Sequence, residues 1–252
     1  MDWDWSIKKD WSKEDKIYSR KREVSNKGSR EHEHLIGSIY SHKMKRSVQY
    51  ESFWGECLFY YLLELDPLTI RYYEQPVIVP LKKMTKDYLL KEEGHVPDVL
   101  HFREGSRPNL IQIKGGNNYV EQEKHLYQAC KNYAMERGWD YSVVNPKVSI
   151  PSIVKENILS LVNYLRPREY YGDLVPEVNR RIAYQGKVEV IRLAKSFEPK
   201  LDYRFVLPLI FHLIASGSLM TNINKKVDHT SEVTVGTIFS DIKQLFVMGE
   251  SK

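Results

Sequence analysis

The sequence predicts an α/β fold, a mixed sheet flanked by helices, followed by a smaller and mainly helical C-terminal domain. Three observations support this prediction. Short apolar runs separated by polar turns recur between residues 69 and 145, a helical pattern at 120–138 interrupts them, and residues 176–252 are mainly helical in pattern. At 252 residues the chain can hold one large domain or two modest ones.

The central region opens with a helical pattern and a strand-like pattern. Residues 51–66 form an apolar helical stretch, which the helix-breaking Pro67 ends. The strand-like run at 69–81 contains Pro76 and Pro80, which favour an edge strand or a bend because proline cannot donate to a sheet ladder.

A hairpin, a helix and a further strand complete the central region. The apolar runs 95–102 and 109–116 are short strands joined by the turn sequence REGSRP. A helix at 120–138 ends at Gly138, and 139–145 returns as a strand.

The remaining segments predict the domain limits. A helical stretch at 150–165 closes the central region. The C-terminal region contains an amphipathic helix, which begins at residue 204 and is followed by Gly217, and a strand-like run at 231–239. Charge, glycine and proline mark a linker between them. The predicted regions are a basic arm at 1–46, a mixed-sheet domain at 47–165, a linker at 166–175 and a C-terminal domain at 176–252.

Composition argues against a membrane protein and for a reducing compartment. The longest apolar run, 205–215, is interrupted by Pro208 and His212 and falls short of the roughly 20 residues that a bilayer requires. The first ten residues lack an apolar signal core. Cys57 and Cys130 lie in apolar helical patterns, which favours two buried thiols over a disulfide. We therefore expect a cytoplasmic protein without membrane contact.

Positive charge is concentrated in the N-terminal arm. Residues 1–46 hold 12 Lys and Arg against 8 Asp and Glu, whereas the rest of the chain holds 26 against 25. The arm favours contacts with phosphates, and a solvated, partly flexible tail is an equal alternative. Trp3, Trp5 and Trp11 lie at its start, where they either cover the folded domain or dock on a partner.

The chemistry is concentrated in the predicted hairpin. Asp98 follows Pro97 at the start of one strand, and Gln112 and Lys114 lie two apart in the next, so their side chains face the same way. Carboxylates at such a site hold Mg²⁺, which prefers oxygen ligands, and the backbone carbonyl of Ile113 is a further ligand. The metal ion stabilises charge on a phosphate and lowers the pKa of a bound water. The lysine orients that water or neutralises developing charge. The alternative is an aspartate at a turn with a surface lysine nearby.

Glu56 is the candidate for a further acidic ligand. It lies among the apolar residues of the predicted helix, which directs its carboxylate inward, and a buried carboxylate needs a partner. A metal ion together with Lys114 supplies one, and a salt bridge to an arginine or lysine is the alternative. Gln112 is out of character at a metal site because an amide binds Mg²⁺ less strongly than a carboxylate.

With these residues in place, the sequence resembles the TnsA family, the endonuclease subunits of heteromeric bacterial transposases. Four segments carry the resemblance, and two flanking segments, 39–47 and 153–165, support it. The four are Glu56 followed by FYYLLELD, the EQP of residues 74–76, the PD of Pro97 and Asp98, and the QIK of residues 112–114. The resemblance implies a restriction-endonuclease-like core over residues 39–165 and, less strongly, a winged-helix-like C-terminal domain. In that family glutamine is the usual residue at the position of Gln112.

The resemblance also implies the roles of the site residues and the partners. Glu56, Asp98 and Gln112 surround one or two Mg²⁺ ions, for which Mn²⁺ can substitute, and Lys114 is the catalytic base or orients the nucleophile. The substrate is transposon-end DNA, cut at the 5′ ends, while a TnsB-like DDE transposase cuts the 3′ ends. A TnsC-like AAA+ ATPase binds through the C-terminal domain.

Two other classes of function remain open from the sequence. An autonomous nuclease, either a Holliday-junction resolvase or a restriction enzyme, has a similar core, and a catalytically silent DNA- or protein-binding module retains the fold.

The scarcity of Lys and Arg in the segment from Arg204 to Lys226 favours a protein contact by the C-terminal domain over a DNA contact, with a structural cap as the alternative. Glu74, His95, His101 and His125 are expected to support the fold.

Overall fold

The computed structural model describes residues 5, 7–22, 36–84, 90–115 and 123–240. Within these ranges the chain divides into two compact units. The N-terminal unit comprises the residues up to Phe59 together with Leu68–Val148, and the C-terminal unit comprises Tyr60–Pro67 and the residues from Ser149 onward. In the described residues no helix is long and apolar enough to cross a membrane.

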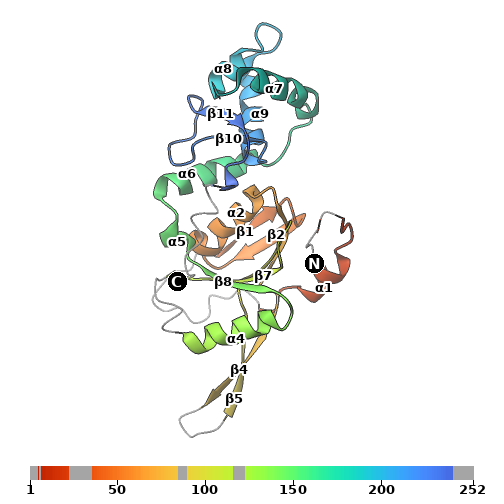
Figure 1. The fold of residues 1–252 in the computed structure, drawn as a ribbon, viewed down its shortest axis with the longest axis vertical. Coiled ribbons are helices and arrows are strands. Elements are labelled where there is room, and N and C mark those ends of the chain that lie inside the picture. Colours follow the sequence, from red (N-terminus) through yellow and green to blue (C-terminus); the bar gives the residue numbers. More distant parts are fainter. Residues whose placement is uncertain (1–4, 6, 23–35, 85–89, 116–122, 241–252) are drawn as a thin grey trace. The chain divides into compact units, whose positions relative to one another are not determined.

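A four-stranded mixed sheet forms the centre of the N-terminal unit (Figure 1). Its strands, in order, are β3 (Thr69–Glu74), β6 (Val99–Arg103), β7 (Asn109–Ile113) and β8 (Asp140–Val144). The pairs β3–β6 and β6–β7 are antiparallel, whereas β7 and β8 are parallel. A parallel pair needs a crossover connection, and α4 (Lys124–Met135) is part of the connection between β7 and β8. The prediction of an α/β fold with a mixed sheet flanked by helices is confirmed.

The predicted hairpin is present as β6 and β7. Its register pairs Val99 with Ile111 and Leu100 with Leu110. All four side chains are buried because both strands lie inside the sheet. Asp98 directly precedes β6, and Gln112 is the fourth residue of β7. The register of the two strands therefore fixes the position of Asp98 relative to Gln112.

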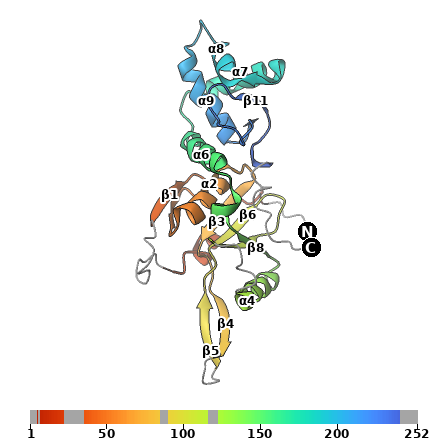
Figure 2. The same cartoon turned by 90° about the vertical axis from the view of Figure 1, so that its left-hand side faces the viewer.

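Two further hairpins belong to the same unit. β1 (Gly37–Ser41) pairs with β2 (Arg46–Tyr50), and β4 (Val79–Met84) pairs with β5 (Leu90–His95). The β4–β5 hairpin extends away from the central sheet in both views (Figures 1 and 2). The predicted strand at 69–81 is therefore divided into β3, which is an edge strand, and β4.

The predicted helix at 51–66 is also present, and it begins with a wider turn. A π-helical turn, η1 (Phe53–Cys57), leads into α2 (Leu58–Leu65). The backbone N–H of Cys57 donates to the carbonyl of Ser52 at 3.0 Å, and the Ser52 hydroxyl accepts from the N–H of Gly55 at 3.1 Å. Such π-turns occur frequently at functional sites.

The described part of the N-terminal arm packs on the N-terminal unit. It contains the short helix α1 (Ser12–Ile17). The rings of Trp5 and Trp11 each lie 5.2 Å from the ring of Phe102, and the indole N–H of Trp5 donates to the carbonyl of Ser106 at 3.0 Å. These tryptophans cover the folded domain, as one of the two readings of the sequence expected. Trp3 lies outside the described residues.

The C-terminal unit is mainly helical, as predicted, and contains a small antiparallel sheet. The sheet has the order β10-β11-β9. The elements of the unit follow one another along the chain in the order α6 (Ser152–Leu161), the 3₁₀ turn η2 (Val162–Tyr164), α7 (Tyr171–Gln185), β9 (Val188–Glu189), α8 (Val190–Lys195), α9 (Tyr203–Ala215), β10 (Leu219–Met220) and β11 (Glu232–Val235). The short helix α5 (Pro146–Ser149) precedes them.

A glycine follows the end of α9, as the sequence predicts. Gly217 follows α9 with a φ of +82°, a conformation that other residues rarely adopt. A Cβ at this position would lie 2.9 Å from Cγ of Pro67, so the glycine also permits a close approach to this proline, two residues after the end of α2.

Three of the predicted boundaries are wrong. The limit of the arm at residue 46 cuts through the β1–β2 hairpin. The predicted linker at 166–175 overlaps α7, which begins at Tyr171 and tolerates Pro176 near its start. The limit of the sheet domain at residue 165 is also wrong, because α6 belongs to the C-terminal unit. Residues 241–252 of the predicted C-terminal domain lie outside the described residues.

Asn157 shows why α6 packs with the C-terminal unit. Its side-chain amide donates to the carbonyls of Ile223 and Lys225 at 2.8 and 2.7 Å and accepts from the N–H of Val227 at 2.9 Å. The side chain is buried, so these hydrogen bonds replace the water that it loses on folding. The composition of residues 150–165 gives no sign of this long-range contact.

Candidate active site

Asp98 is the centre of the candidate site. Its carboxylate is buried, and Oδ2 accepts hydrogen bonds from the backbone N–H of Ile113 at 2.6 Å and from the side-chain amide of Gln112. Both donors lie on β7, so the antiparallel pairing of β6 with β7 brings them beside the aspartate. The structure thus brings together Asp98, Gln112 and Ile113, which the sequence placed on a common hairpin.

The amide of Gln112 has a defined orientation. Its Oε1 lies 2.7 Å from Nε2 of His95, and its Nε2 donates to Asp98 and lies 3.5 Å from the carbonyl oxygen of Ile113. The amide nitrogen therefore faces two of the oxygen atoms that were expected to bind a metal ion. The oxygen of the amide faces the histidine instead.

Glu56 approaches the site from the π-turn η1. Its side chain is buried, and Oε2 accepts a hydrogen bond from the backbone N–H of Glu51 at 2.5 Å. Gly55 precedes it, and a Cβ at Gly55 would lie 2.8 Å from the hydroxyl oxygen of Ser52 and 3.4 Å from Cγ2 of Ile113. The glycine therefore allows the turn that carries Glu56 to pack closely against the end of β7.

The electrostatics of the two buried carboxylates are linked. Burial raises the pKa of Asp98, and the negative charge of Glu56 raises it further, whereas the N–H of Ile113 opposes the change. Burial also raises the pKa of Glu56, against the opposing hydrogen bond from Glu51. A cation placed between the two carboxylates would reverse these effects, because it favours their charged forms.

Lys114 lies at the end of β7 and within electrostatic reach of the aspartate. Its backbone N–H donates to the carbonyl of Val144 at 2.9 Å, which continues the β7–β8 ladder past Ile113. The positive charge of its side chain opposes the effect of burial on the pKa of Asp98. Its Nζ also lies 3.5 Å from a carboxylate oxygen of Glu123.

The site residues carry several oxygen atoms of the kinds that Mg²⁺ accepts. The oxygen atoms of Asp98 and of the Ile113 carbonyl both face the amide nitrogen of Gln112. Glu56 is close enough for its charge to raise the pKa of Asp98. A half-turn of the Gln112 amide would exchange its nitrogen for its oxygen. The set then consists of carboxylates, a carbonyl and an amide, all oxygen donors that Mg²⁺ accepts. The residues therefore fit the ion.

The described residues contain no cluster of three or more His, Cys, Asp or Glu side chains arranged to hold a metal ion. The expected set has a different composition, since only Glu56 and Asp98 among its members are carboxylates. Its remaining oxygens come from Gln112 and from the backbone of Ile113.

His95 is a contact residue that the sequence did not reveal. It was expected to be a strand-edge histidine that supports the fold, and it does end β5. Its ring also binds the amide of Gln112, and burial lowers its pKa. A neutral imidazole has one donor and one acceptor nitrogen, so it can bind either end of an amide. The only sequence signal is its place three residues before Asp98.

The N-terminal arm brings arginines to the edge of the same site. Arg22 pairs with Glu51, with 2.6 Å between Nη2 and Oε2. The side chain of Arg20 donates to Gln75 Oε1 at 3.0 Å, and the Gln75 amide donates to Glu51 Oε1 at 3.2 Å. The basic composition of the arm predicted phosphate contacts, but no pattern in the sequence places these residues beside Glu56.

Glu74 supports the fold, in agreement with the preferred interpretation of the sequence. Its buried carboxylate accepts bonds from both terminal nitrogens of Arg46, at 2.7 and 2.6 Å. Such two-point pairing satisfies the charge without a metal ion. His101 is likewise structural, since its Nε2 lies 2.8 Å from the hydroxyl oxygen of the buried Thr69. His125 is exposed on α4.

Comparison with known proteins provides no family for the chain. No protein-family model matches it, and no curated protein matches its sequence. The geometry of the site and the resemblance seen in its motifs therefore carry any functional conclusion.

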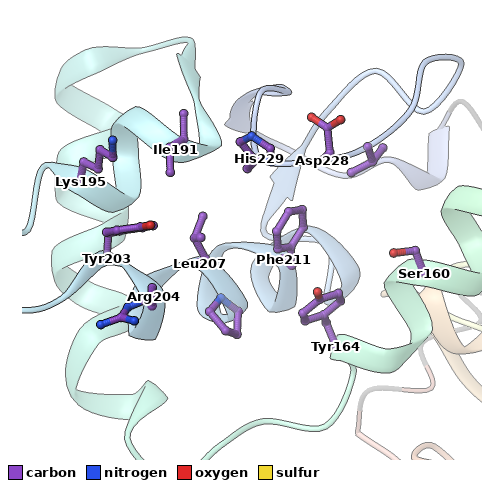
Figure 3. A pocket seen from close by; sticks show the side chains of 12 residues that line it. Ser160, Tyr164, Ile191, Lys195, Tyr203, Arg204, Leu207, Phe211, Asp228 and His229 are labelled. Atoms are coloured by element: carbon purple, nitrogen blue, oxygen red, sulfur yellow. The ribbon is translucent and has the colours of Figure 1, made fainter.

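The C-terminal unit contains an open cavity of about 700 Å³. Figure 3 shows aromatic and basic side chains around it, contributed by η2, α8, α9 and the loop that holds Asp228. The aromatic residues are Tyr164, Tyr203 and Phe211, and the basic ones are Lys195, Arg204 and His229. Arg204 pairs with Asp202 at 2.6 Å.

Proposed function

We propose that this protein is a Mg²⁺-dependent DNA endonuclease of the TnsA type, which cleaves the 5′ ends of a transposon during cut-and-paste transposition. The observation that carries the proposal is the arrangement around Asp98. A buried carboxylate, the Gln112 amide and the Ile113 backbone meet there, with Glu56 and Lys114 close enough to influence its charge. This set supports phosphodiester hydrolysis.

Each residue has a distinct task in the proposed reaction. Glu56, Asp98, Gln112 and the carbonyl of Ile113 would hold the metal ion. Bound Mg²⁺ supplies positive charge that stabilises the phosphate in the transition state. Lys114 orients the attacking water or neutralises the charge that develops beside Asp98. His95 holds the amide of Gln112 in place.

The order of elements in the C-terminal unit supports a winged-helix-like assignment. A helix, a short strand, two helices and a two-stranded hairpin follow one another as α7, β9, α8, α9, β10 and β11. The sheet pairs β11 with both other strands. In this proposal the hairpin that contains β11 is the wing. The finer assignment of the N-terminal unit, a restriction-endonuclease-like core, is supported by its mixed sheet and by the site residues.

The proposal includes two protein partners. A TnsB-like DDE transposase would cut the 3′ ends and read most of the end sequence, and a TnsC-like AAA+ ATPase would bind the C-terminal unit. The aromatic and basic lining of the cavity in that unit is compatible with a protein contact. The face of the N-terminal unit that carries Glu56 and Asp98 would contact the transposon-end DNA, together with the part of the arm that lies beside this face.

Strand-specific mapping of end cleavage tests this function. A duplex that carries the transposon end is incubated with Mg²⁺ and the companion transposase, and both strands are mapped. We expect wild type to cut the 5′ end and Asp98→Ala to leave it uncut while the 3′ cut persists. Asp140→Ala, which removes an exposed carboxylate from β8, is the matched control and should cut normally.

The alternative functions give different outcomes in the same experiment. Efficient cutting by the purified protein without any transposase would indicate an autonomous endonuclease. Absence of any 5′ cut by wild type, with the complete set of partners present and active at the 3′ end, would indicate a catalytically silent binding module and would overturn the proposal.

A further inference from the structure

The arm segment Arg20–Arg22 is joined to the candidate site by a chain of backbone hydrogen bonds. The N–H of Lys21 donates to the carbonyl of Gln75 at 2.9 Å, and the N–H of Gln75 donates to the carbonyl of Asp98 at 2.8 Å. Gln75 has a φ of +48° and precedes Pro76, so the chain turns sharply where it meets both partners. The backbone between Arg20 and Arg22 is therefore held at a fixed place, two hydrogen bonds away from the backbone of Asp98.

Arg22 is also linked to the second carboxylate of the site. Its Nη2 contacts Glu51 Oε2 at 2.6 Å, and the backbone N–H of Glu51 donates to Glu56 Oε2 at 2.5 Å. Burial is the main influence on the pKa values of the site groups, and the positive charge of Arg22 has a smaller lowering effect on the pKa values of Glu56, Asp98 and His95. The field of this arginine thus reaches the whole site.

The two arginines of the segment differ in how they are used. The side chain of Arg20 is 16% exposed and donates to Gln75, to Gln49 and to the backbone carbonyl of Arg22. The side chain of Arg22 is 51% exposed. Arg20 therefore fastens the segment, whereas Arg22 presents its guanidinium to the solvent from which DNA would approach.

The charge of the site creates a need for such a group. The carboxylates of Glu51, Glu56 and Asp98 line the place that a polyanionic strand has to approach, and their charged forms, which a bound cation favours, repel phosphates more strongly at a partly buried site. A guanidinium carries several N–H donors in one plane, so it can hold a carboxylate and a phosphate oxygen together. An exposed ion pair contributes little to stability, which leaves the position of Arg22 without a purely structural explanation.

We propose that Arg22 binds a backbone phosphate of the cleaved strand and positions that strand at the site formed by Glu56 and Asp98. This inference rests on the proposed nuclease function and deepens it. Arg22 is a positioning residue, because it would contact a phosphate next to the reacting one and carries no proton to or from the reaction. Glu51 holds its guanidinium in place before DNA binds.

The test combines variants of the full-length protein with altered DNA. The variants are Arg22→Ala, Arg22→Lys and Lys13→Ala, the last of which removes one positive charge from an exposed position on α1. The DNA is the transposon-end duplex with a single neutral methylphosphonate linkage at each position around the 5′ cleavage point in turn. Both the cleavage rate, with the companion transposase and Mg²⁺, and the binding affinity without divalent metal are measured.

The expected result is a coupling between Arg22 and one phosphate. Arg22→Ala should slow 5′ cleavage by about tenfold to hundredfold, the usual range for a hydrogen bond to a charged group. Arg22→Lys should retain part of the rate, and Lys13→Ala should cut normally. At one linkage the methylphosphonate should weaken wild type but have no added effect on Arg22→Ala, in both rate and affinity, as a double-mutant cycle requires for a direct contact.

Other outcomes would overturn the inference. If Asp98→Ala loses 5′ cleavage while Arg22→Ala cuts like wild type, the nuclease function stands and the role of Arg22 fails. If the effects of Arg22→Ala and of the methylphosphonate multiply at every linkage, Arg22 contacts none of the tested phosphates and acts only through the fold. If wild type makes no 5′ cut, the nuclease function fails and the inference fails with it.

Discussion

His95 Nε2 lies 2.7 Å from Oε1 of Gln112, and this contact turns the amide nitrogen of Gln112 toward Asp98 and the carbonyl of Ile113. The N–H donor of the amide therefore faces both of these oxygen atoms. Metal binding would require the amide to make a half-turn, after which its nitrogen would face His95. Because burial keeps the imidazole neutral by lowering its pKa, the ring can accept from that nitrogen after a change of tautomer.

The first prediction concerns this histidine. We expect His95→Phe, which keeps a ring but loses both nitrogens, to raise the Mg²⁺ concentration needed for half-maximal 5′ cleavage by about tenfold, the lower end of the effect of losing a residue that orients a metal ligand. A metal titration of the cleavage rate measures the change. His125→Phe on α4 is the control, and an equal shift in both variants would contradict a specific role.

The second prediction concerns the stability of the metal-free protein. Burial raises the pKa values of Glu56 and Asp98 above their ordinary values of 4.5 and 3.8, and the negative charge of Glu56 raises the pKa of Asp98 further. Their contribution to stability is fully present below those ordinary values and is lost as the pH rises through the raised ones. We expect Glu56→Gln to raise the Tm at neutral pH by a few degrees and to flatten its decline with pH.

Thermal unfolding with and without Mg²⁺ completes that experiment. Mg²⁺ should raise the Tm of wild type because a ligand stabilises the state that binds it, and it should have little effect on Glu56→Gln. The same variant should lose 5′ cleavage. A variant that is less stable than wild type at neutral pH without metal would show that the Glu56 carboxylate is not under electrostatic stress.

The third prediction separates chemistry from assembly. Lys114→Ala should abolish 5′-end cleavage while the partner transposase still joins the 3′ ends, so that transposition yields cointegrates in place of simple insertions. Lys131→Ala removes an exposed lysine from α4 and should give simple insertions. Product structure on gels distinguishes the two results, and unchanged excision by Lys114→Ala would refute the assignment of Lys114.

The fourth prediction concerns the ion pair between the half-exposed Arg46 and the buried Glu74. Arg46→Ala should destabilise the N-terminal unit by about 3 kcal/mol, because it leaves a buried carboxylate without its partner. Replacing both residues, as Arg46→Leu with Glu74→Gln, should restore much of this stability. Denaturant unfolding followed by tryptophan fluorescence measures the difference. A double variant as unstable as Arg46→Ala would exclude the unpaired charge as the cause.

The fifth prediction addresses the C-terminal unit. Asn157→Leu removes two buried hydrogen bonds and one that is partly buried. It leaves the backbone groups of Ile223, Lys225 and Val227 without those partners, at a cost of about 3 kcal/mol or more. We expect faster hydrogen exchange throughout the C-terminal unit and unchanged exchange in β6 and β7. Equal loss of protection in both units would show that they unfold together.

The parts of the fold that the sequence predicted are those with local signals. Alternating apolar residues, a polar turn and a terminal glycine identified the β6–β7 hairpin and α4, and the spacing of Gln112 and Lys114 placed both side chains near Asp98. The domain limits failed because they depend on contacts between distant residues. Asn157 forms hydrogen bonds with residues 66 to 70 positions away. Pro176 lies inside α7, although the charge, glycine and proline around it are typical of a linker.

The site itself was predicted in outline but not in detail. Periodicity placed Glu56 on the inner side of a helix, yet the π-turn that directs it arises from the packing of Gly55 against Ser52 and Ile113. The contact of His95 with Gln112 crosses from one hairpin to another. The position of Arg22 depends on an arm whose docking is set by aromatic contacts with Phe102.

The docking of the arm has a practical consequence for anyone who produces this protein in shortened form. A chain trimmed to begin at β1 would expose the ring of Phe102, which Trp5, Trp11 and Tyr18 contact at 5.2, 5.2 and 6.1 Å, and would favour aggregation during purification. It would also leave the Glu51 side chain without Arg20 and Arg22. An inactive truncated protein would therefore say little about the untrimmed chain, and affinity tags are better placed away from the first tryptophans.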